Sequence, residues 1–392
     1  MSHLQAKNIS VEFNRVSDSY EIRVEAGLLA SIGEFARKSL DRKTRQICLI
    51  SNAKVFGFYG ERAQISLENA GFRVFSWLMK DGERYKNLRS LETALGFLSQ
   101  NKFTRNDAVI ALGGGVAGDL AGFAAAVYQR GIPFLQVPTT VLAQIDSSVG
   151  GKTGINTNFG KNLVGAFHQP AGVLVDVETL RTLPQRELQA GFYEIVKHAA
   201  LSGTELLNQT SDFLQKFSLK KHRQNFAGTN RIKFLEELQS LISSNINFKA
   251  QIVANDEREN ANRDDARSRK ILNFGHTAGH AIEKITDYRR FKHGEAVAYG
   301  MRAAIEISKR LGKLPQHELN LLNEVLHSVG KLPNAENLSP EKIIEAFVHD
   351  KKASGDSFKW ILLERIGSPL IIDDKDIPEA VVSDSLRSAL QS

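Results

Sequence analysis

A glycine-rich stretch in the middle of the chain carries the residue types of an anion site. Residues 137–170 read VPTTVLAQIDSSVGGKTGINTNFGKNLVGAFHQP and contain Asp146, Lys152, Lys161, Asn162 and His168. The glycines let the backbone turn tightly and approach a ligand closely, and the lysines supply compact positive charge. The stretch therefore predicts an anion-binding site, and the alternative is a solvated loop with scattered charge.

A second group of residues has the types and spacing of metal ligands. In NFGHTAGHAIE, His276 and His280 are four residues apart and so share one face of a helix. FKHGEAVAYGM supplies His293, and YEIVKH supplies Glu194. One carboxylate with imidazoles from separate elements is typical of a catalytic zinc site with an open position. The spacing alone makes both His276 and His280 ligands, although paired histidines on a helix often only hydrogen-bond in a polar core.

A third motif is typical of phosphate binding. The run GGGVAGDLAGFAAA begins at residue 113, after an apolar run at 108–112, and leads into an alanine-rich segment. A glycine turn between a strand and a helix presents backbone N–H groups and a helix N-terminus to a phosphate. The spacing is not that of the usual dinucleotide fingerprint, but the position favours the pyrophosphate of NAD.

The elements that must position these groups alternate in the first half of the chain. Short apolar runs predict buried strands at 45–51, 72–79, 108–112, 133–137 and 171–177, with helices at 56–71 and 86–100. The alternating runs Lys7–Phe13 and Tyr20–Val24 could form a hairpin. This order predicts a doubly wound α/β domain.

From Pro184 onward the pattern is helical. Helices are expected at 185–201, 205–217, 231–253, 271–285, 295–311 and 318–329. We therefore predict an α/β NAD-binding domain at 1–180 and an all-helical domain at 181–392 that binds metal and substrate. Only the last dozen residues look dispensable.

Composition bounds the class of protein. A chain of 392 residues suits two domains, and 42% hydrophobic with 24% charged residues is typical of a soluble globular protein. The single cysteine, Cys48, excludes a disulfide within the chain and a thiolate metal site, and fits a cytoplasmic setting. There is no signal-peptide pattern, and the apolar stretch 111–128 contains glycines and Asp119, which disfavour a membrane span. The net charge of +7 suits an anionic partner, but the basic residues are too dispersed to favour nucleic acid.

The motifs together resemble a known family. The ordered words IDSSVGGKTGIN, GKNLVGAFHQP, GHTAGHAIE and HGEAVAYGM resemble the signature of the 3-dehydroquinate synthase family, within the sugar phosphate cyclases, and the similarity runs from about residue 45 to 365. It implies conversion of 3-deoxy-D-arabino-heptulosonate 7-phosphate to 3-dehydroquinate and phosphate, with NAD and one Zn²⁺ or Co²⁺. The implied steps are oxidation of a secondary alcohol, loss of phosphate, reduction of the ketone, and ring opening with aldol closure.

The resemblance also assigns roles to residues. It implies that the metal ligands are Glu194, His276 and His293, and that His280 faces the substrate instead of the metal. The implied catalytic residues are Asp146, Lys152, Asn162, Lys197, Glu259 and His280. The implied substrate residues are Arg130, Asp146, Lys152, Asn162, Lys197, Lys249, Arg269, Asn273, His280 and Lys351, with Lys352 as the alternative to Lys351. The implied NAD residues are Ser51, Asn52, Glu83, Lys86, Gly114, Gly115, Val116, Asp119, Thr139, Thr140, Lys161, Thr179 and Thr182. Arg130 would reach the phosphate of the partner subunit, which implies a homodimer.

Other functions remain open. The nearest alternative is a sugar phosphate cyclase that acts on sedoheptulose 7-phosphate or glucose 6-phosphate, but Arg269 and Asn273 suit a substrate carboxylate. A metal-dependent polyol dehydrogenase would need no phosphate clamp, and an anion-binding scaffold would need no metal ligands. Three departures from the family pattern stand out: the loop 260–268 is long, Tyr193 replaces a small residue, and His168 replaces a common tyrosine.

Overall fold

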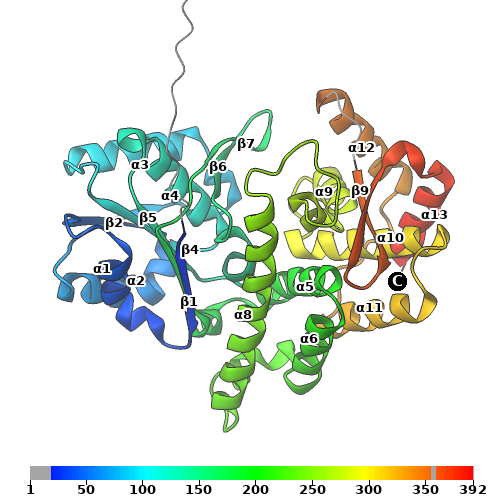
Figure 1. The fold of residues 1–392 in the computed structure, drawn as a ribbon, viewed down its shortest axis with the longest axis horizontal. Helices are drawn as coiled ribbons and strands as arrows, with labels where there is room; N and C mark the ends of the chain where they lie inside the picture. Colours follow the sequence, from blue (N-terminus) through cyan, green and yellow to red (C-terminus); the bar gives the residue numbers. More distant parts are fainter. Residues whose placement is uncertain (1–18, 355–358, 392) are drawn as a thin grey trace, which may run out of the picture.

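The computed structural model describes residues 19–354 and 359–391, without the side chains of 348–354. Its N-terminal half is built on a six-stranded parallel sheet (Figure 1). In spatial order the strands are β1 (Glu21–Glu25), β8 (Gly172–Asp176), β5 (Phe134–Pro138), β4 (Ala108–Gly113), β2 (Gln46–Asn52) and β3 (Arg73–Met79). The predicted doubly wound sheet is confirmed. The expected partner of β1, Lys7–Phe13, lies outside the described residues.

Helices cover both faces of this sheet. They are α1 (Ile32–Ser39), α2 (Ala53–Asn69), α3 (Leu88–Gln100) and α4 (Gly115–Val127). Ile47 and Leu49 of β2 pack in one cluster with α1 and α2. The alternate residues Cys48 and Ile50 pack in another cluster with α3 and α4. A strand buried on both faces must be apolar throughout, which is why the short apolar runs predicted these strands correctly.

The glycine-rich stretch forms a hairpin. Strands β6 (Lys152–Thr157) and β7 (Gly160–Phe167) pair antiparallel and project from the sheet (Figure 1). A Cβ atom on Gly165 would lie 2.1 Å from the Thr153 carbonyl oxygen, so glycine is required at this close approach of the two paired strands. A π-helical turn, η4 (Ala143–Ser147), precedes the hairpin and carries Asp146.

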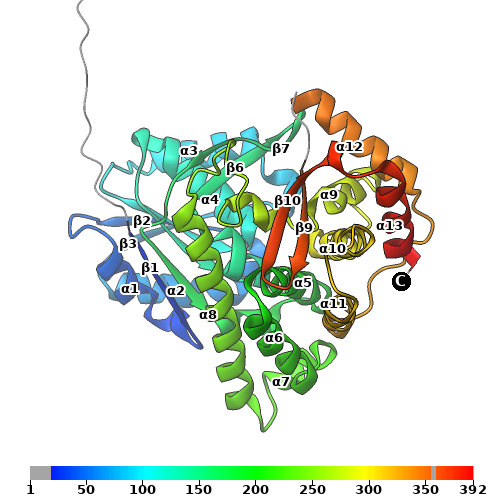
Figure 2. The ribbon, with the colours of Figure 1, turned by 45° about the vertical axis from the view of Figure 1, so that its right-hand side comes forward.

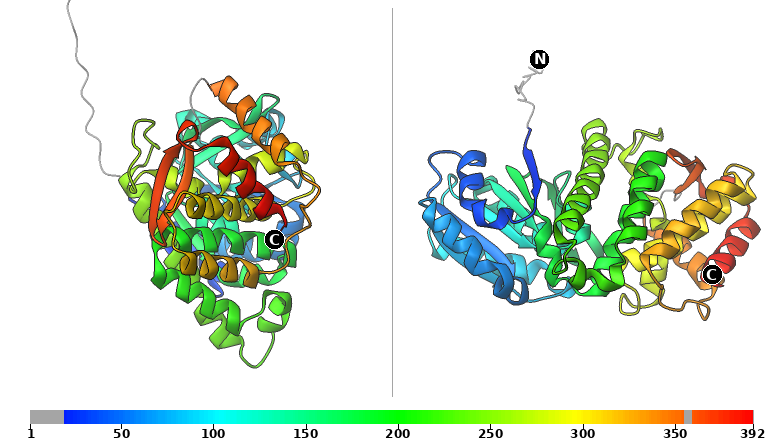
Figure 3. Two further views of the ribbon diagram at one scale, coloured as in Figure 1. Left: turned by 90° about the vertical axis from the view of Figure 1, so that its right-hand side faces the viewer. Right: turned by 90° about the horizontal axis from the view of Figure 1, so that it is seen from below.

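The C-terminal half is mainly helical (Figure 2). Its helices are α5 (Gln185–Ser202), α6 (Thr204–Lys216), α7 (His222–Asn225), α8 (Arg231–Asn255), α9 (His276–Ile285), α10 (His293–Arg310), α11 (Gln316–Val329), α12 (Pro340–Ser354) and α13 (Glu379–Gln391). The long helix α8 contacts η4 and β1 as well as α5 and α6, so it lies where the two halves meet (Figure 3).

Three expectations for this half were wrong. It is not all-helical, because β9 (Lys359–Arg365) and β10 (Ser368–Asp373) form an antiparallel hairpin whose WILL run is buried. The helix expected at 271–285 is broken at Gly275, where φ is 78° and a 3-10 turn, η7 (Arg269–Asn273), gives way to α9. The last dozen residues are not dispensable, since α13 buries Val382 and Leu386 and packs on α10.

The halves share part of their core. Val173 and Val175 of β8 belong to the same buried cluster as the helices of the C-terminal half. Because this core is continuous between the two halves, it does not define where one domain ends. The predicted boundary at residue 180, with domains 1–180 and 181–392, stays a prediction. In the described parts of the chain, no helix is both long enough and apolar enough to span a bilayer.

Candidate active site

Helices α9 and α10 bring three histidines together. His276 is the first residue of α9, His280 lies one turn later, and His293 is the first residue of α10. One ring nitrogen from each histidine lies within 4.8 Å of the others. The His276 ring centroid is 5.3 Å from that of His280 and 5.2 Å from that of His293. A single metal ion could contact all three.

Glycines allow the two helices to approach closely enough for this arrangement. A Cβ atom on Gly300 of α10 would stand 1.8 Å from the carbonyl oxygen of Gly275, the residue before His276. A Cβ atom on Gly279 would lie 3.1 Å from the Val297 Cα atom. The separation of His276 and His293 thus depends on backbone contact between α9 and α10.

A buried carboxylate completes the cluster. Glu194 of α5 is fully buried, and its Oε1 lies 3.8 Å from His276 Nε2 and 3.6 Å from His293 Nε2. These distances are too long for hydrogen bonds. Oε1 accepts no hydrogen bond from the described residues, whereas Oε2 forms an ion pair with Lys197 Nζ at 2.6 Å. Ligand atoms about 2.0–2.2 Å from a tetrahedral zinc are roughly 3.3–3.6 Å apart, so these residues fit one divalent metal.

Burial keeps two of the imidazoles neutral. It lowers the pKa of His276 well below 6.5 and that of His280 to about 4. Burial is the largest influence on His293 and acts to lower its pKa, but the hydrogen bond with Glu283 and the negative charges of Glu194 and Glu283 together outweigh burial and raise that pKa. Neutral imidazoles have a free lone pair for a metal.

Two buried lysines meet Asp146 beside this cluster. Lys197 Nζ lies 3.5 Å from Asp146 Oδ2, and Lys249 pairs with Asp146 Oδ1. Burial acts to raise the pKa of Asp146, but Lys249 and Lys197 hold it well below 3.8. Burial lowers the pKa of Lys249 to about 8 even though Asp146 opposes the change. An anion that binds these lysines must therefore compete with Asp146.

Other predicted substrate residues lie around the same region. Lys152 at the start of β6 pairs with Glu259. Arg269 is buried and donates from Nη1 to the Gly150 carbonyl at 3.1 Å and the Glu257 carbonyl at 2.8 Å. Asn273 is exposed at the end of η7. These contacts link the β6 end of the sheet half to the end of α8.

One predicted residue, Arg130, is not brought into the cluster, and the alternatives Lys351 and Lys352 are not tested. Arg130 lies exposed in the 3-10 turn after α4, at φ 68°, and no contact among the described residues joins it to the buried lysines. The side chains of Lys351 and Lys352 lie outside the described residues.

The predicted NAD residues gather at the carboxyl ends of the strands. The chain order reverses between β2 and β4, which is where ligands bind in open α/β sheets. Ser51 and Asn52 end β2 on one side of this point. Gly114, Gly115 and Val116 lie on the other side, where Gly114 is the N-cap of α4 without a side-chain cap. The first N–H groups of α4 therefore remain available for a phosphate.

One buried ammonium group joins both sets of predicted residues. Lys86 Nζ donates to Asp119 Oδ2 at 2.8 Å and to Asn162 Oδ1 at 2.6 Å, and it lies 3.3 Å from Glu83 Oε1. Burial acts to lower the pKa of Lys86, but Asp119 and Glu83 raise it overall. Lys86 therefore remains charged and connects β7 to the carboxyl ends of the sheet strands.

The threonines have structural partners. Thr139 is buried after β5, and Thr140 accepts a hydrogen bond from the Ala143 N–H through its hydroxyl. Thr179 donates to the Asp176 carbonyl at 2.7 Å, and the Thr182 hydroxyl lies 2.6 Å from that of Tyr59. All four stand near the carboxyl edge of the sheet.

Comparison with known proteins decides the family. The family model described as 3-dehydroquinate synthase N-terminal matches residues 76–190, and the model described as 3-dehydroquinate synthase C-terminal matches residues 191–353. A 3-dehydroquinate synthase from Nostoc punctiforme is 39% identical over 385 residues, which cover 97% of this chain and 98% of the relative. The chain belongs to the 3-dehydroquinate synthase family.

Solved structures place the fold among the sugar phosphate cyclases. A 2-deoxy-scyllo-inosose synthase complexed with carbaglucose-6-phosphate, NAD⁺ and Co²⁺ has a TM-score of 0.74 and 25% identity, covering 94% of this chain and 96% of its own. A 2-epi-5-epi-valiolone synthase from Streptomyces hygroscopicus, with NAD⁺ and Zn²⁺ bound, has a TM-score of 0.80 and 22% identity, covering 98% and 99%. The predicted family and enzyme class are confirmed, and the expected cofactors, NAD and a divalent metal, are those bound in both solved neighbours.

The sequence did not single out one charged residue, Glu283, that contacts the histidine cluster. Glu283 is mostly buried, and its Oε2 lies 3.1 Å from His293 Nδ1. The signal was present, because Glu283 follows His280 by three residues on the same helix. The two substitutions noted in the sequence have local partners: the Tyr193 hydroxyl donates to the Gly330 carbonyl, and a His168 ring nitrogen lies 2.9 Å from the Ile132 carbonyl oxygen.

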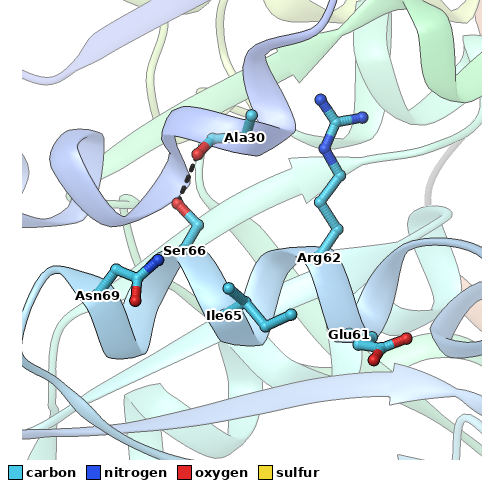
Figure 4. A pocket seen from close by; sticks show the side chains of 6 residues that line it. All are labelled: Ala30, Glu61, Arg62, Ile65, Ser66 and Asn69. Carbon is cyan, nitrogen blue, oxygen red and sulfur yellow. Dashed lines mark hydrogen bonds between the residues drawn. The ribbon is translucent and has the colours of Figure 1, made fainter.

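A shallow pocket of about 340 Å³ lies elsewhere, on the outer side of α2 (Figure 4). Its lining residues are Ala30, Glu61, Arg62, Ile65, Ser66 and Asn69. The Ser66 hydroxyl there donates to the Ala30 carbonyl, which connects α2 to the turn before α1. The pocket contains none of the predicted site residues, so we assign it no part in catalysis.

Proposed function

We propose that this chain catalyses the 3-dehydroquinate synthase reaction at the cluster between α5, α8, α9 and α10. One observation carries the proposal: the fully buried Glu194 faces His276 and His293 while its neighbours Lys197 and Lys249 hold positive charge in the same buried region. A metal site beside a cationic pocket is what a phosphorylated hydroxy acid requires.

The metal ligands in this proposal are Glu194, His276 and His293. When bound, the metal would supply Lewis-acid stabilisation of substrate oxygens, and NAD would accept and return a hydride. Both histidines have Nδ1 near an oxygen, the Phe274 carbonyl for His276 at 3.2 Å and Glu283 for His293 at 3.1 Å. Among the described residues His280 has no such oxygen. This difference supports the revised ligand set and leaves His280 for the substrate.

The cationic residues bind and orient the substrate. Lys197 and Lys249 are held in place by Asp146, and Lys152 by Glu259. A substrate dianion could take over these ammonium groups, with the released carboxylates free to accept protons from substrate hydroxyls. Lys86 connects Asn162 to Asp119, so the same network would hold both the substrate and NAD sides.

Three variants test these assignments. His276→Ala and His293→Ala should each lose tightly bound zinc, whereas His280→Ala should keep zinc and lose phosphate release. Zinc content after dialysis and phosphate release from 3-deoxy-D-arabino-heptulosonate 7-phosphate are the two measurements. If His280→Ala also loses zinc, His280 is a ligand, as its spacing from His276 alone suggests.

We also propose a homodimer in which Arg130 enters the partner's site. Arg130 is exposed, and no contact among the described residues joins it to the buried lysines of its own chain, which supports this assignment. Inactive Arg130→Ala and Lys197→Ala variants, refolded together, should regain about a quarter of wild-type activity, because half of the dimers would have one complete site. No recovery in a dimer would mean that Arg130 does not act across the interface.

A cytoplasmic location completes the proposal. The buried free thiol of Cys48 and the proposed need for NAD support it. Cell fractionation with an antibody against the chain tests it, and recovery outside the cytoplasm would refute it.

A further inference from the structure

We propose that Glu283 is a positioning residue of the metal site: it fixes the ring of His293 so that Nε2 faces Glu194, and Lys161 of the β6–β7 hairpin holds its second oxygen. This inference rests on the ligand set proposed above and adds a residue that lies outside it.

The His293 ring lies between two carboxylates. Glu283 Oε2 is 3.1 Å from Nδ1, and Glu194 Oε1 is 3.6 Å from Nε2. An ionised carboxylate only accepts hydrogen bonds, so Nδ1 must carry the hydrogen that Glu283 receives. In the neutral imidazole this leaves the lone pair on Nε2, the nitrogen that faces Glu194. Glu283 thereby selects the tautomer and the ring orientation that a metal needs.

The second oxygen of Glu283 is held from the other half of the molecule. Its Oε1 lies 3.5 Å from Lys161 Nζ on β7. Lys161 Nζ also stands 3.8 Å from the centroid of the Tyr288 ring, and the Tyr288 N–H donates to the Glu283 carbonyl at 2.8 Å. The carboxylate is therefore fixed on both sides, and it connects the hairpin to a metal ligand.

The test is metal affinity in variants that leave all three proposed ligands intact. Glu283→Gln keeps the size of the side chain but removes its charge. It should weaken zinc binding by about 10–100-fold, the usual cost of losing such a partner. Competition with a chromogenic chelator measures the zinc dissociation constant, and the absorption spectrum of the cobalt-loaded protein should change because a neutral amide oxygen accepts the His293 Nδ1 hydrogen bond more weakly than a carboxylate does.

Two controls separate this effect from others. Glu306 lies on α10 about three and a half turns beyond His293, so Glu306→Gln should leave zinc affinity unchanged. Lys161→Met removes the Lys161 ion pair but keeps the contact of Glu283 with His293, so its loss of affinity should be smaller than that of Glu283→Gln. If Glu283→Gln does not fold, Glu283→Asp, which withdraws the carboxylate by one methylene group, should show the weaker binding.

The outcomes distinguish this inference from the proposed function. If His293→Ala loses zinc but Glu283→Gln binds zinc as tightly as wild type with an unchanged cobalt spectrum, the role of Glu283 is refuted and the ligand set stands. If His293→Ala keeps zinc at wild-type affinity, the ligand set itself is refuted. A wild-type melting temperature for metal-free Glu283→Gln, together with weaker zinc binding, supports positioning rather than a general loss of structure.

Discussion

Replacing Gly300 with alanine should weaken the metal site without altering any proposed ligand. The new Cβ atom would lie 1.8 Å from the Gly275 carbonyl oxygen, whereas real Cβ atoms essentially never approach closer than 3.0 Å. The difference, about 1.2 Å, must be taken up by moving α10 away from the start of α9. Because Gly275 immediately precedes His276, that movement separates His276 from His293.

The energetic cost follows from the same contact. Overpacking of a closely packed interior costs about 1–3 kcal/mol, and alanine recovers about 0.5–1 kcal/mol of helix stability relative to glycine. Because the clash is with backbone atoms, the upper part of the overpacking range applies, about 2–3 kcal/mol, and the expected net loss in the free energy of unfolding is about 1–2.5 kcal/mol. A shift of about 1 Å exceeds the tolerance of roughly 0.5 Å for a preorganised site, so zinc affinity should fall at least about tenfold.

A matched glycine provides the control. Gly96 lies within α3, and a Cβ atom there would meet no atom within 4 Å. Gly96→Ala should raise stability by about 0.5–1 kcal/mol and leave zinc affinity unchanged. The assays are thermal melting of the metal-free protein and chelator competition for zinc. Wild-type melting and wild-type zinc affinity in Gly300→Ala would refute the claim that backbone contact between α9 and α10 sets the histidine spacing.

Two further predictions concern stability. Burial acts to raise the pKa of Asp107, but hydrogen bonds from the Thr104 and Gln46 N–H groups outweigh it and lower the pKa below 3.8. The ionised Asp107 carboxylate therefore stabilises the fold above pH 3.8, and this stabilisation is lost as the pH falls through the pKa that Asp107 has in the folded state. The difference in melting temperature between wild type and Asp107→Asn should shrink below about pH 4. A difference that stays constant with pH would contradict this. Leu386→Ala in α13 should lower the free energy of unfolding by about 2–5 kcal/mol, because this leucine is only 1% exposed. The control Arg387→Ala, at an exposed position of the same helix, should change it by less than about 0.5 kcal/mol in denaturant unfolding. Equal effects of the two variants would mean that α13 is not part of the core.

Much of the fold could be predicted because parallel strands have a simple signature. The apolar run at 45–51 nearly coincides with β2, since a strand buried on both faces excludes polar residues. The break between η7 and α9 could not be predicted, because the helical spacing of apolar residues continues across Gly275 and only its φ of 78° separates the two. The hairpin β9–β10 was missed because its first strand is one short apolar run that a buried helix would also allow.

The site was predictable to the level of its motifs. The specific sequence words around Glu194, His276 and His293 predicted these three residues as ligands; the structure brings them together, and their role as ligands stays a prediction. The contact of Glu283 with His293 was not found, because it joins α9 to α10 and depends on how closely Gly300 lets the helices pack. The arrangement of Arg130 across a subunit interface stays a prediction for the same reason: it depends on a contact beyond the single chain.

The measurement that tests the central claim most directly is phosphate release from 3-deoxy-D-arabino-heptulosonate 7-phosphate, with and without NAD and with the metal chelated, while absorbance at the NADH band is followed. The account predicts release that requires both NAD and metal, without net accumulation of NADH. Release only from sedoheptulose 7-phosphate or glucose 6-phosphate, or steady accumulation of NADH on a simple polyol, would contradict it.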